Sequence, residues 1–486
     1  MDSIGYGSLI LALSIIGAAS LLLIGGCAQN APYHTNPGAS GNCQGEKADE
    51  EGCTQAYYQE HHDYDLAFVE FSERGNAFND SYVDDVLNRI RQKVQQDGAV
   101  LIVFVHGWKH NASETDKNVE EFEKTLLGIK GELRKEFGKN PKLAKRQLIG
   151  IYVGWRGKSL QVPGLINATF WDRKATAEEV GKGGVTSLLL ELNQILEDKE
   201  RELELKNEPD LNVLVAVGHS FGGAIVVSAL NEVLTERVIK RHPKQERHPK
   251  QGLARTIMDG VIVINPAIEA AHALPFVEAA IQAPYQPEQR PIFVSLSSDA
   301  DWPTHYTFPI GQTLGLLTWK QTDLKRRYLR DRGKSTQELT LREKHLDTTT
   351  IGNFAPFLTH RLTKREDNGE SYFNFQTCKN DPEGCKPKGL TTLSGQPFIE
   401  KLPQNYPLYF IKTDATVMSG HNDIFNPAVR AFLVTVIDDV VRGKLATAKA
   451  AGAPKGTSRQ SILTRPDDLV RQMQKRYAEM SPESRR

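Results

Sequence analysis

The chain has 486 residues, of which 39% are hydrophobic and 25% are charged, so it can bury a full core as an ordinary globular protein does. Lysine plus arginine and aspartate plus glutamate both number 60, which leaves no net field to favour nucleic acid or an anionic surface. The sequence also lacks a basic stripe with interleaved aromatic residues, which argues against a nucleic-acid partner.

The first 26 residues predict a segment that exports or anchors the chain. No charge occurs from Ser3 to Gly26, and small residues then precede Cys27, where a signal peptidase could cut. This pattern resembles the lipobox of bacterial lipoproteins, which implies that Cys27 is lipidated and that the protein faces the periplasm or the exterior. No Lys or Arg precedes the apolar run, unlike in most signal peptides, so an uncleaved transmembrane anchor is the alternative.

The remaining four cysteines form two close pairs, Cys43 with Cys53 and Cys378 with Cys385. Each pair would close a small disulfide loop in an oxidising compartment, which the export segment favours. Free thiols and zinc ligands are the alternatives, and zinc ranks last because neither pair has CxxC spacing. We therefore expect no metal.

A tether, a main domain and a tail follow the export segment. Residues 27–60 are small, polar and glycine-rich, which predicts a flexible tether. The main domain is expected over 61–442, and its polar entrance from His61 to Asp65 predicts a solvated loop rather than a metal site. Residues 443–486 are rich in Ala, Lys, Pro and Arg, which predicts a largely disordered tail.

Short apolar runs alternate with amphipathic stretches in the main domain, which predicts an α/β fold with a mostly parallel central sheet flanked by helices. Strands are expected at 66–71, 99–105, 147–153, 213–217, 256–264, 291–296 and 408–412. Helices are expected at 81–96 with Ser81 as N-cap, at 114–137, at 187–205, from about 224, and at 427–442. The helix before the strand at 99–105 leaves the order of the early strands open.

The stretch from Leu211 to Leu230 has the pattern of a strand, a sharp turn and a helix. Gly218 and Gly222 stand two residues either side of Ser220, which lets strand and helix pass close together and pushes the hydroxyl outward. The stretch resembles the G-x-S-x-G nucleophile elbow of the α/β-hydrolase superfamily, which implies that Ser220 is a nucleophile. A glycine-rich turn without catalytic function is the alternative.

A second motif follows the strand at 99–105, where His106 and Gly107 precede Trp108. In α/β-hydrolases an HG pair after the third strand opens the loop that gives the second oxyanion N–H. The resemblance therefore implies that the backbone N–H groups of Trp108 and Phe221 hold the oxyanion, with His106 and Gly107 supporting the loop.

The resemblance also implies an acid and a base. Asp299 and Asp301 follow the strand at 291–296, where the family keeps its acid; Asp301 is the first choice because Trp302 and Pro303 would fix the turn, and Asp299 is the alternative. His421 follows the last core strand and is the base by position. The chain order Ser, Asp, His matches that of α/β-hydrolases.

About a hundred residues, 304–406, separate the last two core strands. They contain Cys378 and Cys385, several aromatic residues and little periodicity. A long insertion at this rim predicts a cap over the site, and a surface subdomain without functional role is the alternative.

These features imply a serine hydrolase that cleaves carboxylic esters through an acyl-enzyme intermediate, without a cofactor, on a small-molecule ester or lipid. A lipase or phospholipase, a thioesterase or a peptidase would use the same residues. A binding lipoprotein that keeps a hydrolase scaffold without turnover is the alternative from another class. The oligomeric state stays open.

Overall fold

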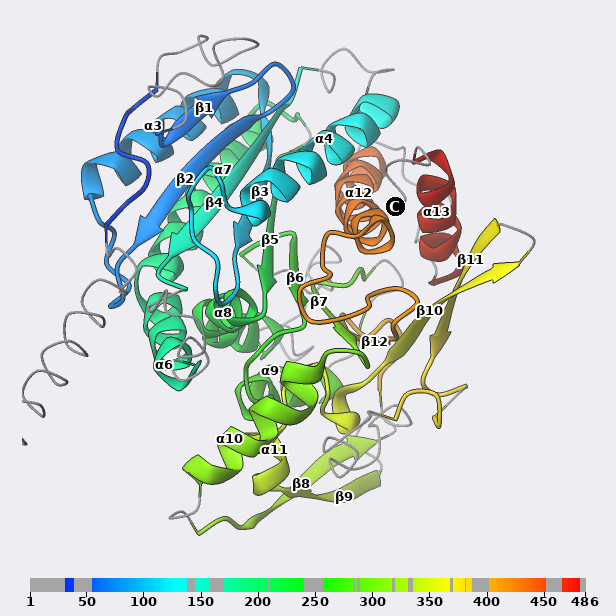
Figure 1. The fold of residues 1–486 in the computed structure, drawn as a ribbon. Helices are drawn as coiled ribbons and strands as arrows, with labels where there is room; N and C mark the ends of the chain where they lie inside the picture. Colours follow the sequence, from blue (N-terminus) through cyan, green and yellow to red (C-terminus); the bar gives the residue numbers. More distant parts are fainter. Residues whose placement is uncertain are drawn as a thin grey trace, which may run out of the picture.

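The structure is a computed structural model. It describes residues 31–38, 55–137, 145–157, 170–208, 210–239, 257–282, 285, 289–316, 320–330, 335–367, 370–380, 382–386, 402–451 and 466–480. A 10-stranded sheet runs through these residues in the strand order β1-β2-β4-β3-β5-β6-β7-β12-β10-β11 (Figure 1). Its strands are β1 (Tyr58–Glu60), β2 (Asp65–Phe71), β3 (Ala99–Val105), β4 (Gln147–Trp155), β5 (Val213–His219), β6 (Gly260–Ile264), β7 (Phe293–Ser298), β10 (His360–Asp367), β11 (Glu370–Thr377) and β12 (Leu408–Thr413).

The sheet is mostly parallel, which confirms the predicted α/β class with a mostly parallel central sheet flanked by helices. All neighbouring strands from β2 to β10 pair in parallel, and the described antiparallel pairs of this sheet join β1 to β2 and β10 to β11 at its two edges. The central strands β3 and β5 are buried along their whole length, because helices cover both faces of the sheet. The carboxyl ends of β5, β6, β7 and β12 consequently lie side by side.

Two layers of helices cover the sheet (Figure 1). One core cluster packs the sheet against α3 (Asp80–Asp97), α7 (Thr186–Leu205), α8 (Phe221–Ile239) and α9 (Ala270–Gln282), with α6 (Phe170–Val180) beside α8. The other packs it against α4 (Lys117–Phe137), α12 (Pro427–Ala451) and α13 (Pro466–Glu479). Buried apolar side chains of the predicted helices α3, α4, α7, α8 and α12 face the sheet, because burying an apolar face is what stabilises helices of this length in water.

The N-cap of α3 lies two residues before the predicted Ser81. Asn79 caps the helix, since its side chain accepts a hydrogen bond from the Ser81 backbone N–H at 3.0 Å and its backbone is extended. Ser81 lies inside the first turn and its hydroxyl donates to the same Asn79 oxygen. Asn and Ser are both good N-caps, so sequence alone does not decide between neighbours of this kind.

Part of the expected tether at 27–60 belongs to the folded domain. The backbone N–H groups of Tyr33 and His34 donate to the Glu70 carboxylate at 2.9 and 2.8 Å. Tyr58 in β1 is buried, and its hydroxyl donates to Asp65 at 2.8 Å. The prediction of a flexible tether is therefore wrong for residues 31–38 and 55–60, because buried tyrosines with satisfied hydroxyls anchor an otherwise polar segment.

The prediction of a disordered tail over 443–486 is also wrong for its described part. The helix α12 runs to Ala451, and α13 packs against α12 and β11. Met473 and Tyr477 are buried, and Arg476 pairs with Asp438. A narrow apolar face within a highly charged segment is enough to hold this helix.

The described residues of the long insertion at 304–406 form separate units. Its strands β10 and β11 extend the main sheet beyond β12, with His360 opposite Ile411 in parallel register. A separate hairpin of β8 (Asp323–Arg330) and β9 (Ser335–Arg342) contacts α9 and α11 (Glu343–Thr348). The expected cap therefore does not describe β10 and β11, which lie at an edge of the sheet.

The described cysteines are joined as expected. A disulfide connects Cys378 and Cys385, both of which are buried. Cys27, Cys43 and Cys53 lie outside the described residues, as does the N-terminal segment with the expected lipidation site. Across the helices that the structure describes, none combines the length and the apolar character needed to cross a bilayer.

Candidate active site

Ser220 occupies the turn between β5 and α8. Its φ is +55°, a left-handed backbone conformation that residues other than glycine seldom adopt. This conformation costs of order 1–3 kcal/mol. Its N–H donates to the Ile264 carbonyl at 3.0 Å, and its own carbonyl accepts from the Ala224 and Ala267 N–H groups at 3.1 and 3.0 Å. Backbone bonds to β6 and α8 thus hold the serine in this strained turn.

The glycines around Ser220 are required by close backbone contacts. A Cβ on Gly222 would lie 2.0 Å from the Val105 carbonyl oxygen, and one on Gly218 would lie 2.6 Å from the Gly222 oxygen. A Cβ on Gly107 would lie 3.0 Å from the Cβ of Ser220. The HG loop after β3 and the turn after β5 are therefore in direct contact.

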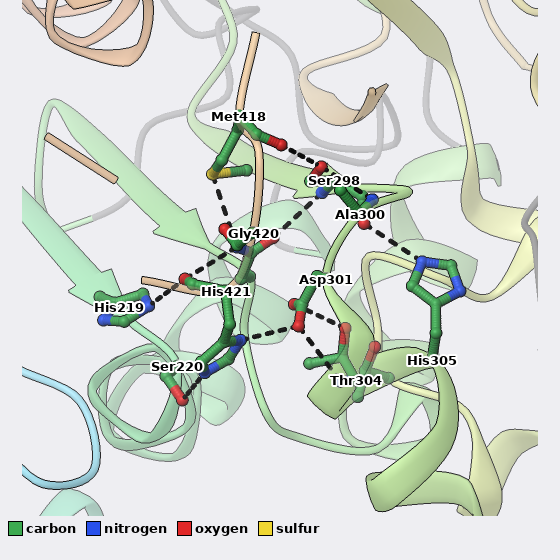
Figure 2. Close-up of polar contacts among 12 residues, drawn as sticks. His219, Ser220, Ser298, Ala300, Asp301, Thr304, His305, Met418, Gly420 and His421 are labelled. Carbon is green, nitrogen blue, oxygen red and sulfur yellow. Dashed lines mark hydrogen bonds and ion pairs between the residues drawn. The ribbon is translucent and has the colours of Figure 1, made fainter. Parts of the chain in front are cut away.

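The structure brings Ser220, His421 and Asp301 into one hydrogen-bonded line (Figure 2). The distance from Ser220 Oγ to His421 Nε2 is 2.7 Å, and that from His421 Nδ1 to Asp301 Oδ1 is 2.8 Å. The serine comes from the end of β5, the aspartate from the turn after β7 and the histidine from the loop after β12. Asp301 and Ser220 precede His421 by 120 and 201 positions in the chain. The three residues meet because the parallel strands before them end at one edge of the sheet.

Asp301 is fully buried and ionised beside His421. Burial alone would raise the pKa of its carboxyl, but His421 and the hydrogen bonds from His421 and Thr304 outweigh burial and hold the pKa below its ordinary value. Thr304 contributes its hydroxyl at 2.6 Å and its backbone N–H at 3.3 Å. An ionised carboxylate here fixes the proton of His421 on Nδ1 and leaves Nε2 as the acceptor that faces Ser220.

Asp299 lies elsewhere, in a separate ion-pair cluster. Its carboxylate accepts from both terminal nitrogens of Arg361 at 3.1 Å and lies 3.4 Å from Lys412 Nζ. The geometry therefore places Asp301, and not Asp299, against His421.

The sequence prediction missed a buried lysine behind the aspartate. Lys412, near the end of β12, is fully buried, and burial lowers its pKa to about 8 despite the nearby carboxylate of Asp299. Its Nζ contacts His305 Nε2 at 3.0 Å and donates to Asn353. Asn353 in turn donates to the Thr304 hydroxyl at 3.0 Å, so a hydrogen-bonded chain connects Lys412 to Asp301. The one sequence signal was a lysine at the end of an otherwise buried strand.

The loop that carries His421 is held from the sheet. His219 Nε2 donates to the His421 carbonyl at 2.9 Å, and the Asn265 amide donates to the same oxygen at 3.1 Å. Burial and the neighbouring His421 push the pKa of His219 well below its ordinary value, so His219 is a neutral donor. Asn265 also accepts from the Ser298 N–H at 3.0 Å, which ties the loop to β7. These two supports were not among the predicted site residues.

The proposed oxyanion loop is fixed by His106. Burial lowers the pKa of His106 to about 4, so the ring is neutral. Its Nε2 accepts from the Trp155 N–H at 3.2 Å, and Nδ1 donates to the Gly107 carbonyl at 2.9 Å. The rings of Trp108 and Phe221 lie 6.5 Å apart, so the two expected donor residues are neighbours across the turn.

Two glutamates and a histidine gather in another cluster. Among the described residues, Glu178, Glu269 and His272 bring ligand atoms close together. Lys174 Nζ lies 2.9 Å from Glu269 and also pairs with Glu178. A lysine ammonium already neutralises these carboxylates, so the group is best described as an ion-pair cluster.

The similarity of the chain to known proteins is weak. No protein-family model and no curated protein matches the chain. Among solved structures, the chain is similar to phospholipase PlaB from Legionella pneumophila in complex with thio-NAD, at 11% identity and a TM-score of 0.24. The match covers 78% of this chain and 64% of that one, so this chain spans less than two thirds of its length. A TM-score of 0.24 is too low to assign a fold or an activity to this chain.

Proposed function

We propose that the protein is a serine hydrolase of the α/β-hydrolase type that cleaves carboxylic esters. The observation that carries this proposal is the line from Ser220 Oγ to His421 and Asp301, at 2.7 and 2.8 Å, with the serine in a strained turn. A strained, preorganised serine next to an imidazole acceptor is the arrangement that activates a hydroxyl for attack.

In the proposed reaction, His421 Nε2 takes the Ser220 proton as the oxygen attacks the ester carbonyl. Ionised Asp301 stabilises the imidazolium, and the backbone N–H groups of Trp108 and Phe221 hold the oxyanion. His421 then protonates the leaving alcohol, and a water molecule, activated by the same histidine, hydrolyses the acyl-enzyme. The roles of Trp108 and Phe221 rest on the resemblance and on the contact between the two loops.

The alternatives to an esterase are other hydrolases and a binding protein. A lipase or phospholipase, a thioesterase or a peptidase would use the same three groups and differ in the pocket. A binding lipoprotein without turnover would have no use for a serine strained at a φ of +55° and bonded to a histidine, so we rank it below an enzyme.

Labelling with a fluorophosphonate probe tests the proposal. The wild-type protein and Ser220→Ala are treated with the probe, and the labelled peptide is identified by mass spectrometry. Label on Ser220 alone supports the activated nucleophile. A folded protein that takes no label would instead favour the binding lipoprotein.

A tether to the cell envelope belongs to the same proposal. Its support is the uncharged segment from Ser3 to Gly26 and the small residues before Cys27. Cells fed an alkyne fatty acid are expected to label the wild type but not Cys27→Ser. Membrane association without label would favour the uncleaved transmembrane anchor.

A further inference from the structure

Four large apolar side chains are exposed on the segment that directly follows Asp301. This segment comprises Trp302, η6 (Pro303–Thr307) and α10 (Phe308–Gly315). The exposed fractions are 63% for Trp302, 37% for Tyr306, 50% for Ile310 and 63% for Leu314. The four residues recur every fourth position, so they form one stripe, which we call the apolar stripe. Single exposed apolar residues are common, but a row of this kind marks a contact surface.

The opposite side of the same segment is fixed to the candidate active site. Thr304, His305 and Phe308 are buried, and the Thr304 hydroxyl donates to Asp301. The rings of Trp302 and Tyr306 stack at 5.9 Å, which orders the start of the stripe. Whatever the apolar stripe contacts is therefore held at the rim of the site that contains Ser220.

Charge is distributed unevenly around the stripe. No charged residue occurs from Trp302 to Leu316. The neighbouring elements α11, β8 and β9 lie with α10 at the lower end of the molecule in Figure 1. In residues 320–348, the described side chains that are exposed and charged are the cations Lys320, Lys325, Arg327, Arg342 and Lys344 and the anions Asp323 and Glu338. Arg327 pairs with Glu338 at 3.1 Å, so the other four cations outnumber one exposed carboxylate.

An apolar stripe bordered by cations fits a lipid surface with anionic headgroups. Trp and Tyr favour the boundary between headgroups and acyl chains, and each nearby cation is attracted to anionic lipid. The uncharged segment from Ser3 to Gly26 would hold the same chain at a membrane. The whole chain has equal numbers of acidic and basic residues, so this attraction comes from a local cluster.

We infer that this face docks on an anionic lipid surface, and that the ester cleaved at Ser220 is a lipid in that surface. The inference rests on the proposed function and adds the substrate class. Docking through the apolar stripe places the lipid bilayer beside the carboxyl ends of β5 and β7, where Ser220 and Asp301 lie. A soluble ester needs no such surface.

The test uses the full chain reconstituted in vesicles with and without anionic phosphatidylglycerol. Two rates are measured, hydrolysis of a monomeric short-chain ester in solution and hydrolysis of a long-chain ester embedded in the vesicle. The double variant Ile310→Gln with Leu314→Gln is compared with Leu190→Gln with Leu205→Gln, which changes two exposed leucines on α7. Thermal unfolding checks that both variants fold.

The stripe variant is expected to lose about tenfold or more of the vesicle rate, because two apolar anchors are lost, and to keep the monomeric rate. The α7 variant is expected to keep both rates. Lys320→Gln with Lys325→Gln removes two of the four cations and is expected to weaken the preference for vesicles that contain phosphatidylglycerol.

Each other outcome has a distinct meaning. An unchanged vesicle rate in the stripe variant overturns the docking inference while leaving the hydrolase intact. Equal loss of both rates in a folded stripe variant also overturns it, since the stripe would then line the pocket itself. A wild type that cleaves neither ester contradicts the proposed function. Quenching of tryptophan fluorescence by brominated lipid, compared between wild type and Trp302→Phe, then still tests docking without turnover.

Discussion

Single substitutions of Asp301 and Asp299 test which of the two carboxylates orients His421. Asp301→Asn removes the charge that holds the His421 proton on Nδ1, so kcat is expected to fall by on the order of 10³–10⁴. Asp299→Asn leaves the contact between His421 and Asp301 intact and should alter kcat much less. It should still lower stability, because Lys412 and Arg361 lose their shared carboxylate. Ester turnover and denaturant unfolding of both variants separate the two effects.

Ser220 and His421 are expected to act as one unit. Ser220→Ala and His421→Ala should each reduce kcat by several orders of magnitude, and the double variant should be little worse than either. The measurement is kcat for the three variants on one ester. Additive losses would contradict a direct proton transfer between the two groups.

Lys412 couples the buried network to pH. Its pKa is about 8 in the folded protein and near 10.5 in the unfolded chain, so between these values the unfolded state binds more protons. Stability is therefore expected to rise as the pH increases from 8 to 10.5, by about 3 kcal/mol relative to Lys412→Met. Denaturant unfolding at pH 7.5 and 10.5 measures this difference. The exposed Lys320→Met is the control and should show no such change.

The residues of the candidate site were predictable to different degrees. Ser220 lies in a local motif, and His421 and Asp301 follow from the order of strands, so their proximity could be expected. Lys412 contacts Asn353, 59 positions away, and no local pattern links the two. Such contacts between distant segments depend on how the fold packs, and the spacing of residues along the sequence does not predict them.

Among the elements, the helix α13 carries a clear prediction. Met473→Ala should lower the free energy of unfolding by about 2–4 kcal/mol, because the side chain is buried between α12 and the edge of the sheet. Lys475→Ala, on the exposed side of the helix, is the control. Equal stability of both variants would mean that α13 contributes nothing to the fold.

The elements that were predicted are those with a strong apolar period. β3 and β5 are continuous apolar runs, and α7 has a clear stripe, so each lies where the sequence predicts it. By contrast, β10 consists mostly of polar residues and is stabilised by pairing with β12. Edge elements of this kind depend on a neighbour, which a sequence pattern does not reveal.

At the scale of the whole molecule, alternation of strands and helices predicted a mostly parallel sheet, because parallel strands need crossover connections. The order β2-β4-β3-β5 was left open, since the sequence does not state which strand crosses over which. Ser220, Asp301 and His421 nevertheless lie together, because the parallel strands that precede them end on the same side of the sheet.

Buried neutral histidines make the whole molecule sensitive to acid. Burial lowers the pKa of His106 to about 4 and that of His360 to about 3, and the pKa of His219 lies well below 6.5. Below pH 6.5 the unfolded chain therefore binds more protons than the folded one, and stability falls as the pH decreases. Each histidine contributes about 1.4 kcal/mol per pH unit, so three together remove about 4 kcal/mol per unit. Between pH 6.5 and pH 4 this loss sums to about 10 kcal/mol, which is most of a typical total stability of about 5–15 kcal/mol, so the free energy of unfolding is expected to fall steeply over this range.

A substitution of His360 measures the contribution of one buried histidine to the loss of stability in acid. His360 stacks on Phe375 at 4.7 Å and packs against Tyr409 at 4.4 Å, so His360→Phe keeps an aromatic ring there and removes the titrating group. The loss of stability between pH 7 and pH 5 should then shrink by about 2 kcal/mol, which denaturant unfolding at the two values measures. His62→Gln, at an exposed position, should leave the loss unchanged. An identical loss in His360→Phe and wild type would show that His360 takes up its proton without unfolding, and acid sensitivity would then have to come from other groups.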